Sequence, residues 1–107
     1  MIFMVDIDGT ICITPLNESG KHDYVKATPI KERIVYLNRF YDQGHTMKYW
    51  TARGTSSGID WFDLTVNQLN EWGVKYHSIA IGKPSYDVWI DDKAINADSM
   101  LDCDDWK

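Results

Sequence analysis

The 107-residue sequence is poor in the residues that build disulfide frameworks, zinc sites and membrane spans. It has two cysteines, Cys12 and Cys103, and three histidines. The cysteines lack metal-ligand spacing, and two ordinary thiols are typical of a cytoplasmic protein. No apolar run approaches the ~20 residues of a membrane span, and no basic segment precedes a long apolar run as in a signal peptide. We therefore expect a cytoplasmic protein without a membrane partner.

Basic residues are also scarce, since 11 Lys and Arg stand against 16 Asp and Glu, for a net charge of −5. Nucleic-acid backbones need a basic face, so we do not expect nucleic acid as the main partner. A small phosphorylated ligand stays compatible with this charge. Proline-rich or glycine-rich linkers are absent, and a chain of this length buries roughly 60–70% of its unfolded surface, enough for one core. We expect one domain spanning residues 1–107.

Segments typical of strands alternate with segments of helical periodicity. We expect strands at residues 2–7, 46–50, 76–81 and 86–90. Between the first two, residues 11–27 read as a loop or short hairpin with a turn near residues 17–20. A helix should then start with Thr28 as N-cap and Pro29 at its first position, and end at Gly44. A second helix should begin within residues 58–60 and end at Gly73, and a last one should cover residues 94–106.

Strands separated by helices imply crossovers and a mainly parallel sheet. The expected fold class is therefore α/β, a three-layer Rossmann-like core with a short sheet. Right-handed crossovers place the carboxyl ends of such strands on one edge.

The first strand runs into Asp6-Ile7-Asp8-Gly9-Thr10. Two carboxylates two residues apart share a face of a continuing strand, and Gly9 lets the backbone turn sharply. Open α/β sheets place their sites at this end of a strand. A strand that simply ends in an Asp-Gly turn is the alternative interpretation.

Two later strand ends also carry polar residues, Thr51 and then Asp91 and Asp92, and Lys83 lies just before the fourth expected strand. Four converging carboxylates repel one another unless a divalent cation lies among them. Because no His or Cys cluster is present, Mg²⁺ is the expected cofactor. Thr51 and Lys83 supply the hydroxyl and the positive charge that suit a phosphoryl group.

These motifs, in this order, resemble the four motifs of the haloacid dehalogenase superfamily, and specifically its phosphatase branch. The resemblance implies that Asp6 is the nucleophile that forms an aspartyl-phosphate and that Asp8 is the general acid and base. It implies that Thr51 and Lys83 bind the phosphoryl oxygens. Metal binding would fall to Asp6, Asp8, Asp91 and Asp92, and which of the last two touches the metal stays open.

Arg53 is a further candidate for binding substrate, with a surface ion pair as the alternative. Residues 49–54 also resemble small relatives associated with capsule or surface-sugar biosynthesis, which favours a sugar phosphate as substrate. Neither interval between motifs is long enough for a cap domain, so the site should be open unless residues 11–27 or a second subunit cover it. The sheet should also leave an edge that pairs in a homo-oligomer.

The expected function is a Mg²⁺-dependent phosphatase of a small phosphorylated metabolite. Two alternatives stay open: a non-catalytic phosphate- or metal-binding module, and a phosphatase of nucleotide or polynucleotide ends.

Overall fold

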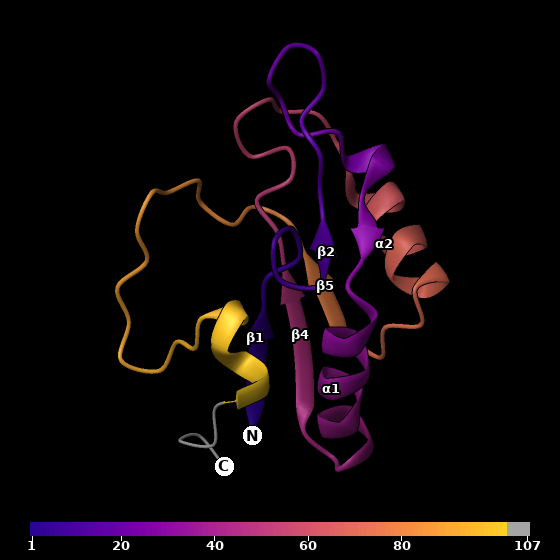
Figure 1. Ribbon diagram of the computed structural model, residues 1–107, viewed down its shortest axis with the longest axis vertical. Helices are drawn as coiled ribbons and strands as arrows, with labels where there is room; N and C mark the ends of the chain where they lie inside the picture. The colour runs from indigo at the N-terminus through magenta and orange to yellow at the C-terminus, as the bar shows by residue number, and fades with distance from the viewer. Residues whose placement is uncertain (103–107) are drawn as a thin grey trace.

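The computed structural model describes residues 1–102 as an α/β fold (Figure 1). A parallel sheet has the order β1-β4-β5, and β2 and β3 form a separate antiparallel pair. The Rossmann-like α/β class expected from the sequence is confirmed. Neither helix is long and apolar enough to cross a membrane, within the residues described. The elements are β1 (Ile2–Val5), β2 (Cys12–Ile13), η1 (Tyr24–Lys26), β3 (Thr28–Pro29), α1 (Lys31–Asp42), β4 (Thr46–Trp50), α2 (Phe62–Glu71), β5 (Ser78–Ala80) and η2 (Ala97–Asp102).

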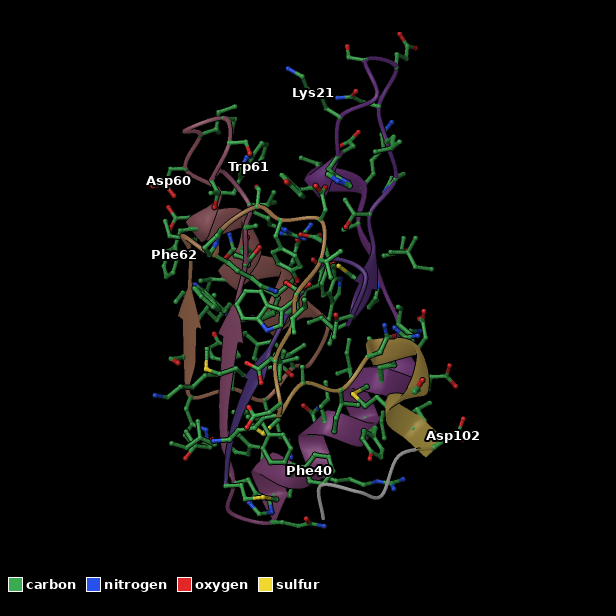
Figure 2. All side chains as sticks on the ribbon, turned by 90° about the vertical axis from the view of Figure 1, so that its left-hand side faces the viewer. Lys21, Phe40, Asp60, Trp61, Phe62 and Asp102 are labelled. Atoms are coloured by element: carbon green, nitrogen blue, oxygen red, sulfur yellow. The ribbon has the colours of Figure 1, made fainter. Side chains whose placement is uncertain are left out.

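One face of the parallel sheet carries the core. Val5, Tyr49 and Ile79 are neighbours in register and point to this face. Both helices cover it, since α1 contributes three buried apolar side chains and α2 contributes Leu69. Successive right-handed crossovers in one direction put both helices on the same side, and Figure 2 shows the strands on one side of α1.

The opposite face of the sheet is largely open. Ile2 and Met4 alternate with the core residues of β1 and are 67% and 59% exposed. Of the three expected layers, residues 1–102 supply the sheet and one layer of helices. The helix that would cover the open face needs a further crossover, and the chain after β5 contains no such helix within the described residues.

The strand expected at residues 86–90 is not formed, and this prediction was wrong. β4 has the predicted bounds, while β1 and β5 are shorter than predicted. Only residues 81–85 separate the third and fourth predicted strands, whereas a parallel crossover needs a dozen residues or more. The segment is rich in residues typical of strands, but the connection is too short to place it in the same sheet as a parallel strand.

The predicted helix starts were also early. Thr28 and Pro29 pair with β2 rather than capping α1, because the fixed φ of proline suits an extended edge as well as a helix start. Ile30 N–H donates to the Ile11 carbonyl (2.8 Å), which keeps the chain extended up to Lys31. The predicted ends of the two helices are confirmed, since Gly44 and Gly73 have φ of +92° and +74° just after α1 and α2.

The second helix begins at Phe62, where Asp60 Oδ1 accepts the Phe62 N–H (2.9 Å). In place of the last predicted helix the chain forms the 3₁₀ segment η2 (Ala97–Asp102), and residues 103–106 of that prediction lie outside the described part.

Residues 11–27 form the expected hairpin, which projects from the body at the top of Figure 1. Leu16 bridges to His22, and Asn17 Oδ1 accepts the N–H groups of Ser19 and Lys21 at the tip.

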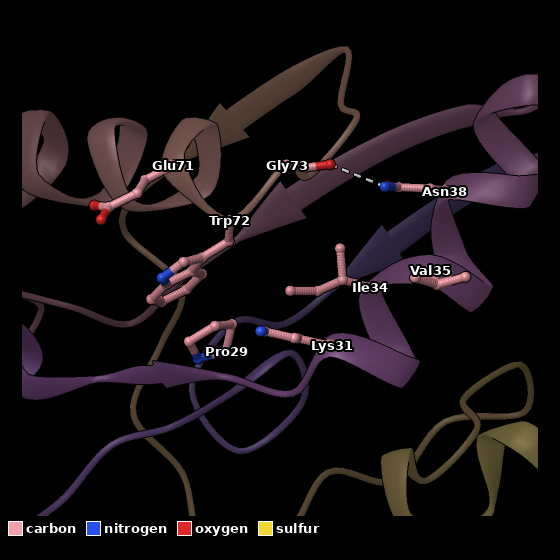
Figure 3. A pocket seen from close by; sticks show the side chains of 8 residues that line it. All are labelled: Pro29, Lys31, Ile34, Val35, Asn38, Glu71, Trp72 and Gly73. Carbon is pink, nitrogen blue, oxygen red and sulfur yellow. Dashed lines mark hydrogen bonds between the residues drawn. The ribbon is translucent and has the colours of Figure 1, made fainter.

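A groove of about 490 Å³ lies between α1 and the end of α2, lined by Ile34, Val35 and Trp72 among others (Figure 3). Asn38 Nδ2 donates to the Gly73 carbonyl across it (2.9 Å). None of the residues predicted for the site lines this groove.

Candidate active site

Three of the predicted site residues meet at the carboxyl edge of the sheet. Asp6 follows β1 directly, Thr51 follows β4, and Lys83 follows β5. The Thr51 N–H donates to the Ala80 carbonyl (3.0 Å), and the Lys83 N–H donates to the Thr51 carbonyl (3.1 Å). These bonds bring the Lys83 Nζ to 3.3 Å from Asp6 Oδ1. The convergence expected from a parallel sheet is therefore present for these three residues.

The Asp6–Lys83 pair has one open and one covered side. The Asp6 side chain is 35% exposed, while that of Lys83 is 10% exposed. The ammonium of Lys83 lies over the rings of Tyr86 and Trp89, 5.1 and 5.5 Å from their centroids, and 3.2 Å from the Tyr86 hydroxyl. The aromatic rings thus hold the cation against Asp6 and leave the carboxylate accessible.

Asp8 lies two residues after Asp6 and forms a bidentate ion pair with Arg53. Arg53 Nε donates to Asp8 Oδ2 and Nη2 donates to Oδ1, both at 2.9 Å. The Arg53 side chain is fully buried and that of Asp8 is 24% exposed. Two parallel charge-assisted bonds of this kind are among the stronger polar contacts in proteins.

The remaining donors of Arg53 are also engaged. Nη1 donates to Gln68 Oε1 (2.6 Å) and to Thr65 Oγ1 (3.1 Å), both on α2. The guanidinium carbon lies 4.8 Å from the centre of the Tyr24 ring, and Gln68 Nε2 donates to the Tyr24 carbonyl (2.6 Å). Arg53 therefore ties the end of β1 to α2 and to the base of the hairpin. It is placed as a buried structural cation beside the site, not as a surface ion-pair partner.

Sequence reasoning missed Thr65, Gln68 and Tyr24. Thr65 and Gln68 are three apart on one helix, so they share a face, and both are buried next to Leu69. Thr65 and Gln68 are polar residues on the otherwise apolar face of a predicted helix, and this pattern could have indicated a buried polar contact.

The pair with Arg53 sets the ionisation of Asp8. Burial alone acts to raise the pKa of Asp8, but hydrogen bonds from Arg53 and Thr14, with the charge of Arg53, outweigh it and hold the pKa below its ordinary value. Asp8 is thus a carboxylate at neutral pH. The ionised Asp8 carboxylate can accept a proton directly. It would have to take up a proton before it could act as a proton donor.

Cys12 lies beside Asp8 but is not a reactive thiol. It is buried, and its Sγ contacts Asp8 Oδ1 (3.5 Å) and Thr14 Oγ1 (3.6 Å). Burial, with the nearby charge of Asp8, raises the pKa of Cys12 to about 11. Since the thiolate is the nucleophile, burial and the raised pKa disfavour Cys12 as a nucleophile.

Asp91 and Asp92 do not join the cluster, contrary to the predicted convergence of four carboxylates. Both are exposed, and Asp91 Oδ1 accepts the N–H of Lys93 (2.6 Å). Within residues 1–102 no group of three or more His, Cys, Asp or Glu side chains is placed to hold a metal ion. The missing fourth strand is the cause, because it was the element expected to deliver these residues to the edge.

The residues at the edge fit part of a Mg²⁺ site. Among residues 1–102, the contact of the Asp6 carboxylate with Lys83 is made through Oδ1, and Mg²⁺ in phosphoryl-transfer sites takes one or two carboxylates together with substrate oxygens and water. A main-chain carbonyl next to Asp6 could also bind the ion. The Ile7 carbonyl already accepts two N–H groups, those of Thr10 and Ile11, so the Asp8 carbonyl is the candidate main-chain ligand for Mg²⁺. The Asp8 carboxylate is occupied by Arg53.

No protein-family model and no curated protein matches this sequence. The fold is similar to the crystal structure of a structural-genomics target from Vibrio cholerae, with a TM-score of 0.81 and 23% sequence identity. The likeness covers 96% of this chain and 89% of that one. At this identity the comparison shows that the two chains share the same α/β fold.

Proposed function

We propose that this protein is a Mg²⁺-dependent phosphatase that hydrolyses a phosphomonoester through an aspartyl-phosphate on Asp6. The observation that carries the proposal is the partly exposed Asp6 carboxylate, paired with the buried Lys83 ammonium at 3.3 Å where three strand ends meet. A nucleophile beside a fixed cation is what a phosphoryl transfer needs, since the cation stabilises charge on the transferring oxygens. The resemblance to haloacid dehalogenase phosphatases supports the same assignment.

The reaction would proceed in two displacements at phosphorus. In the first, an Asp6 carboxylate oxygen forms a bond to phosphorus while the bond to the leaving-group oxygen breaks. In the second, water forms the new bond to phosphorus and the Asp6–phosphorus bond breaks, which releases inorganic phosphate. The Lys83 ammonium would hold the phosphoryl oxygens in both steps. Thr51 Oγ1 accepts the Arg53 N–H (3.0 Å), so its own hydrogen is free to donate to a phosphoryl oxygen.

Asp6 and the Asp8 carbonyl would hold the Mg²⁺, which when bound supplies positive charge to the phosphoryl oxygens. Asp8 itself, kept ionised by Arg53, suits the second step, where it would accept a proton from the attacking water. To donate a proton to the leaving group in the first step, Asp8 must take up a proton against the influence of Arg53. We therefore expect substrates with acidic leaving groups to depend least on Asp8 in the first step.

The proposed substrate is a small sugar phosphate in the cytoplasm. Tyr86 and Trp89 expose 48% and 45% of their surface beside Lys83, which offers an apolar platform next to the phosphoryl position. The two rings are tilted by 59°, so they form no parallel slot for a flat base. The exposed rings offer apolar contact to a sugar ring bound next to the phosphoryl group, and nucleotide or polynucleotide ends stay the alternative.

A generic aryl phosphate with Mg²⁺ tests the proposal. Asp6→Asn should abolish turnover and remove the hydroxylamine-labile phosphoprotein that rapid acid quenching traps in the wild type. Asp42→Asn, which changes an exposed carboxylate on α1, is the matched control and should turn over normally. Equal turnover in wild type and Asp6→Asn would exclude Asp6 as the nucleophile. Stabilisation by phosphate esters without turnover would favour the alternative of a non-catalytic binding module.

A further inference from the structure

The first displacement of the proposed reaction has no ready proton donor among the residues assigned so far. The leaving oxygen of a sugar ester departs as a strongly basic alkoxide unless it receives a proton, and a positioned donor accelerates such a step by about 10²–10⁴-fold. Asp8 is placed as an acceptor. Arg53 donates to both of its oxygens, and Thr14 and Cys12 donate to Oδ1. Asp8 would have to give up one of these bonds to donate a proton to the substrate.

Tyr86 places a hydroxyl group beside the same site. The Lys83 ammonium donates to the Tyr86 hydroxyl oxygen (3.2 Å) and lies 3.3 Å from Asp6 Oδ1. The hydroxyl oxygen and Asp6 Oδ1 are therefore separated by no more than the sum of these two distances, which is the scale of one phosphoryl group with its leaving oxygen. Because the hydroxyl oxygen accepts from Lys83, its own hydrogen is left to donate to a substrate, and a phenol carries this hydrogen at neutral pH.

Packing fixes the position of this hydroxyl at the carboxyl edge of the sheet. The Tyr86 ring lies against the Lys83 ammonium and against the ring of Trp89, at 5.1 Å in both cases. Trp89 in turn meets Trp50, the last residue of β4, edge to face at 6.3 Å. Thr55 Oγ1 donates to the Lys83 carbonyl (2.8 Å) and so ties the chain just before Tyr86 to the loop after β4. Tyr86 is still 48% exposed, so a substrate can reach it.

We propose that Tyr86 is a catalytic residue that donates a proton to the leaving oxygen of the substrate. As an Asp6 oxygen bonds to phosphorus, the bond from phosphorus to the leaving oxygen breaks, and that oxygen takes the hydroxyl proton of Tyr86. The phenolate that remains lies next to the Lys83 ammonium, which stabilises its charge. Water then attacks the aspartyl-phosphate and gives a proton to Asp8. Finally Asp8 releases this proton to solvent and Tyr86 takes one up, so that one ester and one water become an alcohol and phosphate.

The assignment of Tyr86 rests on the proposed function, and it narrows the substrate class. Esters of alcohols have strongly basic leaving oxygens and depend on a proton donor, whereas aryl phosphates with acidic phenols leave without one. A chain that holds a phenol in addition to Asp8 beside the nucleophile is equipped for the first kind of ester. We therefore expect the natural substrate to be the phosphate of an alcohol, such as a sugar hydroxyl, and not an acyl phosphate or a phosphoanhydride.

The dependence of the rate on the leaving group tests this role. Tyr86→Phe keeps the ring over Lys83 and removes only the hydroxyl, and its fold is checked by thermal melting. Its kcat/KM, which reports the first displacement, should fall about 100-fold or more with glycerol phosphate but less than about threefold with 4-nitrophenyl phosphate. The matched control is Tyr76→Phe, which removes a hydroxyl that donates to Asn70 Oδ1 on α2 and should change neither rate.

Two results would overturn the role of Tyr86 alone. If the hydroxyl only holds Lys83 in place, Tyr86→Phe lowers both rates by a similar factor. If Asp8 is the donor, Asp8→Asn shows the steep dependence on the leaving group and Tyr86→Phe does not. We expect Asp8→Asn instead to slow the second displacement with both esters, so that the phosphoprotein on Asp6 accumulates. A wild type that hydrolyses neither ester overturns the proposed function itself, and the assignment of Tyr86 with it.

Discussion

Arg53→Met removes the buried cation that links Asp8 to α2, and it keeps a side chain of similar length. The variant leaves the partly buried Asp8 carboxylate without its two charge-assisted bonds, and it leaves Gln68 Oε1 and Thr65 Oγ1 without the Arg53 donor. Removing one partner of a buried ion pair costs about 3–5 kcal/mol, because the remaining charge stays uncompensated.

That loss is large for this chain. Domains are stable by about 5–15 kcal/mol in total. At 4–8 °C per kcal/mol for a domain of 60–100 residues, the melting temperature should fall by roughly 12–40 °C.

The loss should also depend on pH. In the wild type the pKa of Asp8 is lowered, so the pair stabilises the fold above the unfolded pKa of Asp8, and this contribution is lost as the pH falls through the folded pKa. In Arg53→Met the influence of burial and the hydrogen bond from Thr14 remain, but both contributions of Arg53 are gone, so the pKa of Asp8 is higher than in the wild type. The variant should then gain less stability than the wild type as the pH rises from acid to neutral. The difference between the two proteins is therefore largest at neutral pH and shrinks in acid.

Urea unfolding followed by circular dichroism between pH 3 and 8 measures the effect. The control is Lys75→Met, which breaks the exposed pair with Asp42 at 2.6 Å and should cost no more than about 1 kcal/mol. Arg53→Met/Asp8→Asn should recover part of the loss at neutral pH, since the uncompensated charge is gone. Equal losses for Arg53→Met and Lys75→Met, or a loss that does not vary with pH, would refute the reasoning.

Three further outcomes are expected. Gly54→Ala should destabilise the fold by at least about 2 kcal/mol, because φ is +82° and a Cβ would meet the Ile59 carbonyl oxygen at 2.1 Å. Gly58→Ala is the control, since its φ is +75° but the space around it is open. The control should lose clearly less free energy of unfolding in the same urea titration. Cys12, with its pKa raised to about 11, should react with iodoacetamide at pH 8 only after denaturation, as mass spectrometry of digested protein would show; rapid labelling of the native protein would contradict its burial. Millimolar Mg²⁺ should raise the melting temperature of the wild type but not of Asp6→Asn; the same shift in both would place the ion elsewhere.

The order of the strands and helices could be predicted from the sequence because it depends on local patterns. The apolar residues of 2–5 and 46–50, the helical periodicity of the two helices, and the glycines at 44 and 73 act through nearest neighbours. Parallel strands then bring Asp6, Thr51 and Lys83 to one edge. These residues could be placed together before any contact was known.

Contacts between distant residues could not be read in this way. The sequence by itself determined an α/β chain whose strands end in Asp6, Thr51 and Lys83. Only the tertiary structure decided that Arg53 is buried against Asp8 and α2, because a charged residue is buried only where its partners from other elements satisfy it. It also decided that residues 86–90 pair with no strand in the described sheet, because the reach of the connection after β5, and not the apolar pattern, sets where that segment lies.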